Sequence, residues 1–188
     1  MSQAKTLTEK EIRKVLSYIA IHKHAARNRA MLMVTHLAGC RVGEVAALKI
    51  CDVCSAEGAV KDEIRLQPEQ TKGKHPRTVF VAEKLRKELS AYLKTIDCSD
   101  LGKPLFRTQK RDSFNANTLC QFFHHLYKQA GIEGASSQSG RRTFITTLAN
   151  KGVGVRVLMS LAGHRNISTT QAYIDINDGM KRKAVELI

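Results

Sequence analysis

One stretch of this chain reads as β-structure, and helical patterns lie on both sides of it. The runs EIRLQ and RTVFV are rich in β-favouring residues, and the segment PEQTKGKHP between them carries turn residues. This pattern predicts an antiparallel β-hairpin over residues Glu63 to Val81, with a loop longer than a two-residue turn. The expected fold is therefore mainly α-helical with a small antiparallel β-sheet.

Apolar residues at helical spacing predict helices along the rest of the chain. Thr8 followed by Glu11 has the pattern of a capping box that opens a first helix, and Gly39 stops a second helix over Ala25–Ala38. The other expected helices run from Arg41 to before Asp52 and over Ala82–Ile96, Asn117–Ala130, Arg141–Lys151, Val155–Ala162, Ser168–Ile174 and Asp178–Leu187. Because no repeat or low-complexity linker divides the chain, residues 1–188 are expected to form a single domain.

The charge of the chain favours a polyanionic partner. There are 31 Lys and Arg residues against 17 Asp and Glu, so the formal net charge is +14 and the sequence pI is about 9.8. Release of counterions from phosphates drives the binding of such a protein to nucleic acid. A solvated basic surface is the alternative explanation, but the basic residues are spread through folded-looking sequence, which suits a groove better than a flexible arm.

Two other features exclude whole classes of protein. No apolar run is long enough to span a membrane, and the N-terminal sequence lacks the apolar centre of a secretory signal. Five cysteines without a repeating framework indicate a reducing compartment, and we expect a cytoplasmic protein. Cys51 and Cys54 form a C-x-x-C pair, but no second pair follows at zinc-finger spacing, so two reduced cysteines are favoured over a metal site.

Tyr173 stands apart from the other three tyrosines. Tyr18, Tyr92 and Tyr127 lie in amphipathic patterns, where a ring can join a core, whereas Tyr173 follows the polar run ISTTQ. A tyrosine in polar surroundings can be a recognition group or a nucleophile. Cleavage of a phosphodiester by a tyrosine needs cations for the developing charge and an acid for the departing oxygen.

Four segments of the chain resemble the catalytic domain of the tyrosine recombinases, the phage integrase family. HLAGCRVGEVAAL is similar to the first arginine box, QTKGKHPRTVFV to the hairpin that carries a catalytic lysine, QSGRRTFITTLANKG to the second box and LMSLAGHRNISTTQAYI to the third. They occur in family order at family spacing over roughly residues 8–174. Each residue singled out below also has a purely structural explanation, but one phosphoryl-transfer site accounts for the whole set.

The resemblance implies a role for each of these residues. Tyr173 is the expected nucleophile, which would give a 3′-phosphotyrosyl bond, and Arg41, Arg141 and His164 would hold the scissile phosphate. Lys72, with Lys74 as second choice, would protonate the leaving oxygen. Glu44 is the expected support for the active site at Arg41. The expected contacts to neighbouring phosphates are Lys74, Arg77, Arg142 and Arg165. The family reaction needs no metal, cofactor or small-molecule substrate.

The chain departs from the family pattern at Gln138, where the family usually has histidine. Glutamine can hydrogen-bond a phosphate oxygen but cannot take up a proton near neutral pH. Loss of acid–base help costs ~10²–10⁴ in rate, so a slower enzyme is expected. A type IB topoisomerase, and a catalytically impaired DNA-binding regulator, are the alternative functions.

The resemblance also predicts organisation and partners. The first box begins so early that no N-terminal DNA-clamping domain is expected before it. Residues 176–188 carry an apolar set that would dock on a neighbouring protomer. We therefore expect a monomer in solution and a tetramer on double-stranded DNA recombination sites.

Overall fold

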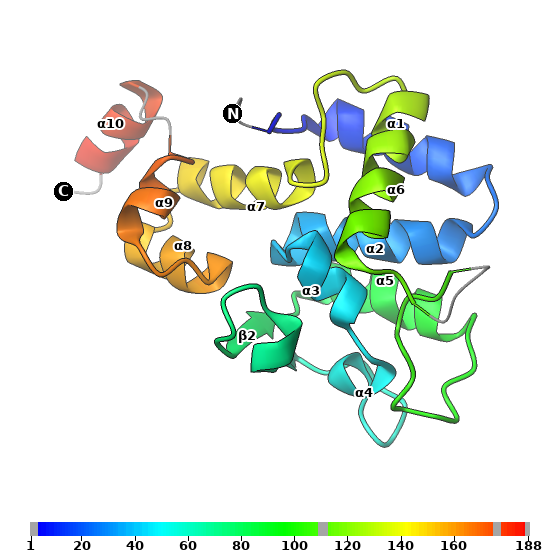
Figure 1. The fold of residues 1–188 in the computed structure, drawn as a ribbon. Coiled ribbons are helices and arrows are strands. Elements are labelled where there is room, and N and C mark those ends of the chain that lie inside the picture. Colours follow the sequence, from blue (N-terminus) through cyan, green and yellow to red (C-terminus); the bar gives the residue numbers. More distant parts are fainter. Residues whose placement is uncertain (1–3, 109–112, 175–177, 187–188) are drawn as a thin grey trace.

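The computed structural model describes residues 4–108, 113–174 and 178–186. Helices make up most of this part, and one two-stranded antiparallel sheet accompanies them (Figure 1). The elements in chain order are α1 (Glu9–Ala20), α2 (Ala25–Ala38), α3 (Val42–Ala47), α4 (Ile50–Val53), β1 (Glu63–Leu66), the 3-10 helix η1 (Pro68–Gln70), β2 (Arg77–Phe80), α5 (Glu83–Leu93), α6 (Ala116–Gln129), α7 (Ser139–Asn150), α8 (Val155–Ala162), α9 (Ile167–Gln171) and α10 (Asp178–Val185). The predicted fold class is confirmed.

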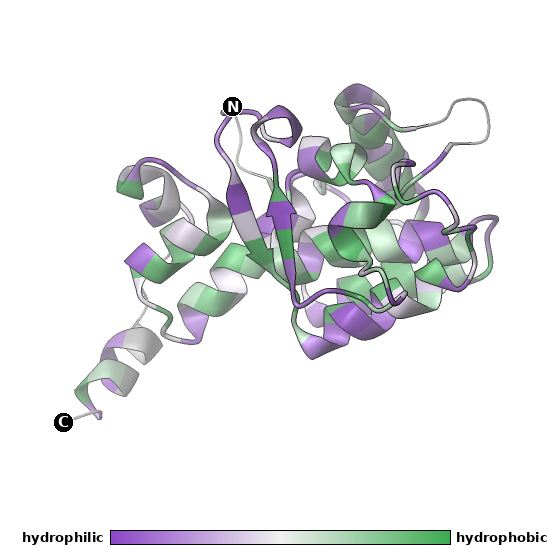
Figure 2. Ribbon diagram, turned by 90° about the horizontal axis from the view of Figure 1, so that it is seen from below, coloured by the Kyte–Doolittle hydropathy of each residue, from purple (hydrophilic) through white to green (hydrophobic). Residues whose placement is uncertain are grey.

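Helix α2 is the centre of the hydrophobic core. Every residue from Ala30 to Thr35 is buried, and the helix packs against α1, α3, α5 and α7. A helix that is apolar on all sides is stable only when other elements surround it. Figure 2 shows this arrangement, with apolar residues gathered where the helices meet and polar residues on the outer turns.

The start of α1 confirms the predicted capping box. The Thr8 hydroxyl accepts a hydrogen bond from the Glu11 amide at 3.2 Å, and the Glu11 carboxylate accepts one from the Thr8 amide at 2.9 Å. These two bonds satisfy amide groups that have no partner inside the helix. The first turn is therefore specified by local sequence alone.

The single helix predicted from Arg41 to before Asp52 is wrong. The chain forms α3, turns extended at Leu48 and Lys49, and then forms the short α4. The Leu48 carbonyl accepts a hydrogen bond from the Leu105 amide at 2.8 Å, and the Ile50 amide donates to the Lys103 carbonyl at 3.0 Å. Pairing with this distant segment outweighs the local helical preference at the break.

The predicted hairpin is confirmed, and it carries its loop toward α8. Glu63 pairs with Phe80 and Leu66 with Arg77, so the loop between the strands holds η1 and the lysines of the TKGK segment. Ile64 and Leu66 are buried, while the alternate residues of β1 face outward. In Figures 1 and 2 the hairpin lies between the α8–α9 pair and the main body of helices.

The C-terminal helices differ slightly from their predicted ranges. Helix α9 ends at Gln171, so Tyr173 lies just beyond it instead of inside the predicted helix Ser168–Ile174. Helix α10 lies at the outer end of the molecule, beyond α9 (Figure 1). Leu187 and Ile188, which belong to the predicted docking tail, fall outside the described residues. No helix in the described ranges has the length and apolar character needed to cross a membrane.

We predict that Gly39→Ala destabilises the protein by about 2–5 kcal/mol. Gly39 ends α2 with φ +63°, and an added Cβ would lie 2.5 Å from the Phe144 ring of α7. A left-handed alanine costs roughly 1–2 kcal/mol, and overpacking adds about 1–3 kcal/mol. Urea unfolding measures the change.

The matched control is Gly152→Ala. Gly152 has φ +85° but no atom within 4 Å of an added Cβ, so only the backbone cost applies. Equal losses for the two variants would show that the contact between Gly39 and Phe144 contributes nothing.

Candidate active site

The predicted first catalytic arginine, Arg41, and its acidic partner, Glu44, form one side of the site. Glu44 is 1% exposed, and its carboxylate accepts hydrogen bonds from the Arg41 amide at 2.8 Å and from Arg41 Nη1 at 3.0 Å. The same carboxylate accepts from Arg77 Nη2 at 2.9 Å. A buried carboxylate requires such partners, since desolvation of an unpaired charge is costly. Glu44 thus fixes the orientation of Arg41 at the start of α3.

Arg77 connects three elements around the site. Its side chain is 9% exposed, and besides Glu44 it donates from Nη1 to the Leu161 carbonyl at 2.7 Å. The guanidinium therefore joins β2 to α3 and to the end of α8. Arg77 also lines the recess that holds Arg41 and Lys72, and its contact with a DNA phosphate stays a prediction.

Arg141 is buried where two helices end. Its side chain donates from Nη1 to the carbonyl of Gly39, which caps α2, at 2.5 Å, and from Nη2 to the carbonyl of Ala162, the last residue of α8, at 2.6 Å. Helix C-terminal carbonyls favour a cation because they lack intrahelical donors and carry the negative end of the helix dipole. Burial, with Arg41 and Arg77 nearby, lowers the pKa of Arg141 to about 10, so the group stays charged at neutral pH.

His164 joins this network directly after the end of α8. Gly163 ends the helix with φ +60°, and its carbonyl accepts a hydrogen bond from Arg41 Nη2 at 3.3 Å. His164 Nε2 lies 2.9 Å from Arg141 Nη2, and its Nδ1 lies 2.9 Å from the Thr170 hydroxyl. Since an arginine can only donate, Nε2 accepts and Nδ1 carries the proton.

His164 is therefore an uncharged hydrogen-bonding group at neutral pH. It is only 8% exposed. Burial, and the positive charges of Arg141, Arg41 and Arg77, lower its pKa from 6.5 to about 4. A neutral imidazole can sit between cations without adding to their mutual repulsion.

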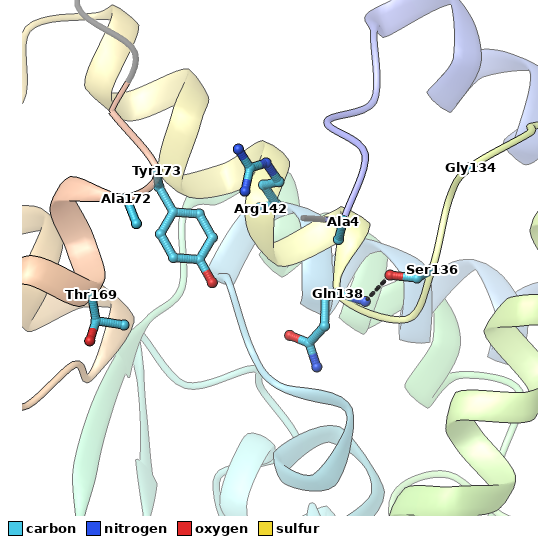
Figure 3. Close-up of a pocket in the computed structure, with 8 residues that line it drawn as sticks. All are labelled: Ala4, Gly134, Ser136, Gln138, Arg142, Thr169, Ala172 and Tyr173. Atoms are coloured by element: carbon cyan, nitrogen blue, oxygen red, sulfur yellow. Dashed lines mark hydrogen bonds between the residues drawn. The ribbon is translucent and has the colours of Figure 1, made fainter. Parts of the chain in front are cut away.

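Tyr173 lies against the network of arginines and His164. Its ring stacks on His164 with centroids 5.6 Å apart and planes at 27°, and the Arg142 guanidinium carbon lies 5.3 Å from the ring centroid. The Thr146 hydroxyl donates to the Tyr173 carbonyl at 3.4 Å. In Figure 3 the phenol hydroxyl points into an open recess, and the Gln138 amide points into the same space.

Two recesses meet at Thr169 and together hold most of the predicted residues. The first, of about 470 Å³, is lined by Tyr173, Gln138 and Arg142 among others. The second, of about 570 Å³, is lined by residues of the first box, the hairpin loop and the third box: Arg41, Glu44, Thr71, Lys72, Gly73, His75, Pro76, Arg77, Gly163, His164, Arg165, Asn166 and Thr169. Lys74 lines neither recess, so Lys72 is the better placed of the two lysines.

Threonines are the site residues that sequence reasoning missed. Thr170 is fully buried and fixes the His164 ring, and Thr146 holds the backbone of Tyr173. Thr169 lines both recesses. The only sequence signal for Thr170 was its place one helical turn before Tyr173, inside a run that reads as polar surface.

The described residues contain no group of three or more His, Cys, Asp or Glu that could hold a metal ion. Cys51 and Cys54, the C-x-x-C pair, are both free thiols, the first half-buried and the second buried.

Comparisons with known proteins show the family of the chain. A sequence model described as the phage integrase family matches residues 5–180. The chain belongs to the phage integrase family. Within this family, the tyrosine recombinase XerA of Pyrococcus horikoshii is 30% identical over 188 residues, covering 98% of this chain and 61% of the relative. The chain thus spans about three-fifths of the length of that relative.

Solved integrase-family structures share the fold. A crystal structure of XerA recombinase matches with a TM-score of 0.77 and 28% identity, covering 100% of this chain and 66% of the other. The Tn1549 transposon integrase, solved in complex with circular intermediate DNA, matches with a TM-score of 0.75 and 19% identity over 99% of this chain and 67% of its own.

We predict that Glu44→Gln lowers the free energy of unfolding by about 3 kcal/mol. The substitution removes the one carboxylate that Arg41 and Arg77 share, and leaves two cations side by side around a buried amide. Chemical denaturation measures the loss.

Glu88→Gln is the control for this prediction. Glu88 also pairs with an arginine, Arg29, at 2.5 Å, but that arginine side chain is 44% exposed. A partly exposed pair contributes about 1 kcal/mol or less. A loss for Glu44→Gln no larger than for Glu88→Gln would contradict a supporting role for Glu44.

Proposed function

We propose that this chain carries the catalytic site of a site-specific DNA recombinase, with Tyr173 as the nucleophile. The observation that carries this proposal is the position of the Tyr173 ring. It lies against His164, which is bonded to Arg141, and its hydroxyl points into a recess that adjoins Arg41 and Lys72 at Thr169 (Figure 3). A nucleophile, cations and a proton donor are the groups that phosphoryl transfer through a tyrosine requires.

The proposed reaction exchanges one phosphodiester for another. The Tyr173 oxygen attacks the phosphorus and gives its proton to water or to the substrate, and the bond from phosphorus to the 5′ oxygen breaks. Lys72 gives a proton to that oxygen, leaving a 3′-phosphotyrosyl bond and a 5′-hydroxyl. The 5′-hydroxyl of a partner strand then attacks the phosphotyrosyl and releases the phenol. Because each step makes as many ester bonds as it breaks, no external energy source is needed.

The arginines divide the electrostatic work. The Arg41 side chain is 29% exposed and lines the recess, so it can bind a non-bridging phosphate oxygen directly. Arg141 supplies positive charge from a buried position, where it is screened less by water. Charge fixed in place before the reaction stabilises the transition state without reorganisation.

Double-stranded DNA is the proposed partner, and the cytoplasm the proposed location. The net charge of +14 and the exposed Lys72 and Arg165 at the recess support a polyanionic ligand. The related fold of the Tn1549 integrase holds DNA in its own structure. All five cysteines are free thiols, as is usual in a reducing compartment.

We predict a covalent protein–DNA adduct that depends on Tyr173. The target site is first recovered by selecting bound duplexes from a random-sequence library. A nicked version of that site, which loses the 5′-hydroxyl fragment after cleavage, then traps the intermediate. Denaturing gel electrophoresis should show an adduct with the native chain and none with Tyr173→Phe.

Gln138→His is the matched gain-of-function control. It restores a group that can accept a proton beside Tyr173, so adduct formation should speed up, by as much as ~10²-fold. If the protein forms the adduct and relaxes supercoiled plasmid but gives no recombinant product, the result would favour a topoisomerase. DNA binding without adduct in either protein would favour a DNA-binding regulator and refute the proposed enzyme.

The C-terminal helix is the proposed assembly element. Helix α10 lies at the outer end of the molecule, and its Ala184 and Val185 are exposed. We predict that deletion of residues 178–188 leaves binding to a single site nearly unchanged but abolishes a tetramer on paired sites. Analytical ultracentrifugation with and without DNA measures both, and undiminished tetramer formation would contradict docking.

A further inference from the structure

We propose that Arg142 is a positioning residue for Tyr173. On this view its guanidinium holds the phenol ring in front of the arginine and histidine network, and it does not bind a DNA phosphate. This inference rests on the proposed function, since it concerns the nucleophile of that reaction. It replaces the role that the sequence suggested for Arg142.

The backbone around Tyr173 provides little support for the ring. Helix α9 ends at Gln171, and the Tyr173 amide donates to the Thr170 carbonyl at 3.0 Å in the turn that follows. The ring itself is therefore positioned by the side chains beside it. Those are His164, with the centroids 5.6 Å apart, and Arg142, whose guanidinium carbon is 5.3 Å from the ring centroid.

The two neighbours of the ring differ in charge. His164 has its pKa lowered to about 4, so it is neutral at pH 7 and contributes a flat apolar surface. Arg142 contributes a planar cation, and a guanidinium within about 6 Å of a tyrosine ring is attracted by the negative face of that ring. The ring is thereby held by one dispersive and one electrostatic contact.

Helix α7 makes a second contact with the segment that carries Tyr173. The Thr146 hydroxyl donates to the Tyr173 carbonyl at 3.4 Å, and Thr146 lies four residues after Arg142. Residues four apart lie on one face of a helix. Arg141, the neighbour of Arg142 in sequence, instead bonds the ends of α2 and α8. The same helix therefore fixes both the buried cation and the nucleophile, which keeps the distance between them constant.

A fixed distance matters for the rate of attack. Displacement of a reacting group by about 1 Å can cost on the order of 10²-fold in rate, even when binding is unchanged. Loss of a cation–π contact of this kind lowers the population of molecules with the Tyr173 ring in this position roughly 3- to 30-fold relative to other ring positions. The expected loss without Arg142 therefore lies in the cleavage step and not in DNA affinity.

The test compares Arg142→Gln with Arg142→Lys and with Arg165→Gln as a matched control. Arg165 is exposed and lines the other recess, where a DNA phosphate contact is expected. Each variant is assayed for DNA affinity at several salt concentrations and for the single-turnover rate of adduct formation at saturating nicked DNA. Thermal unfolding confirms that each variant is folded.

Arg142→Gln should reduce the single-turnover rate roughly 3- to 30-fold and leave affinity and its salt dependence unchanged. Arg142→Lys should recover only part of the rate, since an ammonium keeps the charge but not the planar stacking surface. Arg165→Gln should do the opposite, weakening DNA binding and reducing the salt slope by about 1. An Arg142→Gln variant that behaves like Arg165→Gln would overturn the inference.

A measurement without DNA separates this inference from the proposed function. The rate of iodination of Tyr173, followed by peptide mass spectrometry, should rise severalfold in Arg142→Gln because the ring is released. Tyr92, which is 3% exposed, should stay unmodified in both proteins and so reports that the fold is intact. If the native chain forms no adduct, the proposed function fails and iodination alone decides the positioning role. An unchanged iodination rate would overturn that role.

Discussion

The site depends on one buried cation at the meeting point of two helix ends. Arg141 is 2% exposed, and its donors satisfy the terminal carbonyls of α2 and α8. A neutral apolar side chain in its place would leave those buried carbonyls without donors, each at a cost of about 1–3 kcal/mol. A residue with an expected role in the chemistry thus also joins the central helix α2 to α8. Stability and catalysis cannot be varied independently at this position.

Positive charge exceeds negative charge around Arg141. Two guanidinium groups, those of Arg41 and Arg77, pair with the buried carboxylate of Glu44, and the nearby guanidinium of Arg141 has no carboxylate bonded to it among the contacts described for this part of the chain. Mutual repulsion and burial act in the same direction, since both lower the pKa of Arg141 to about 10. A surplus of fixed positive charge in a partly dry site is relieved when an anion binds between the cations. We expect a phosphate of the proposed DNA ligand to be that anion, bound first by Arg41 in the recess that this side chain lines.

Local signals in the sequence predicted most of the fold. Thr8 and Glu11 form their capping box within one turn, Gly39 ends α2, and the hairpin follows from strands on either side of a turn-rich loop. Each of these depends on residues close together in the chain. The break between α3 and α4 was missed because it depends on Leu48 pairing with Leu105, more than fifty residues away. No local preference at Leu48 indicates that partner.

In the candidate site, too, residues in sequence motifs were predicted, whereas contacts set by distant parts of the chain were not. Arg41, Arg141, His164 and Tyr173 were found because the family boxes specify them together, and the structure brings all four into contact or near-contact. The place of Arg77 was not predictable, since it is set by Glu44 and by the Leu161 carbonyl on another helix. Thr170 was missed for a related reason, because the run around it reads as surface although its hydroxyl is buried against His164.

Gln138 shows which part of the chemistry this site can supply from its own side chains. It lies at the start of α7, exposed, with its amide directed into the recess that Tyr173 lines (Figure 3). An amide can orient a phosphate oxygen by hydrogen bonding but cannot accept the phenol proton. The imidazole that stacks on Tyr173, that of His164, already has Nε2 occupied by Arg141 and its proton on Nδ1. In the proposed reaction we therefore expect water or the substrate to take the proton of Tyr173, while the side chains contribute mainly fixed charge and position.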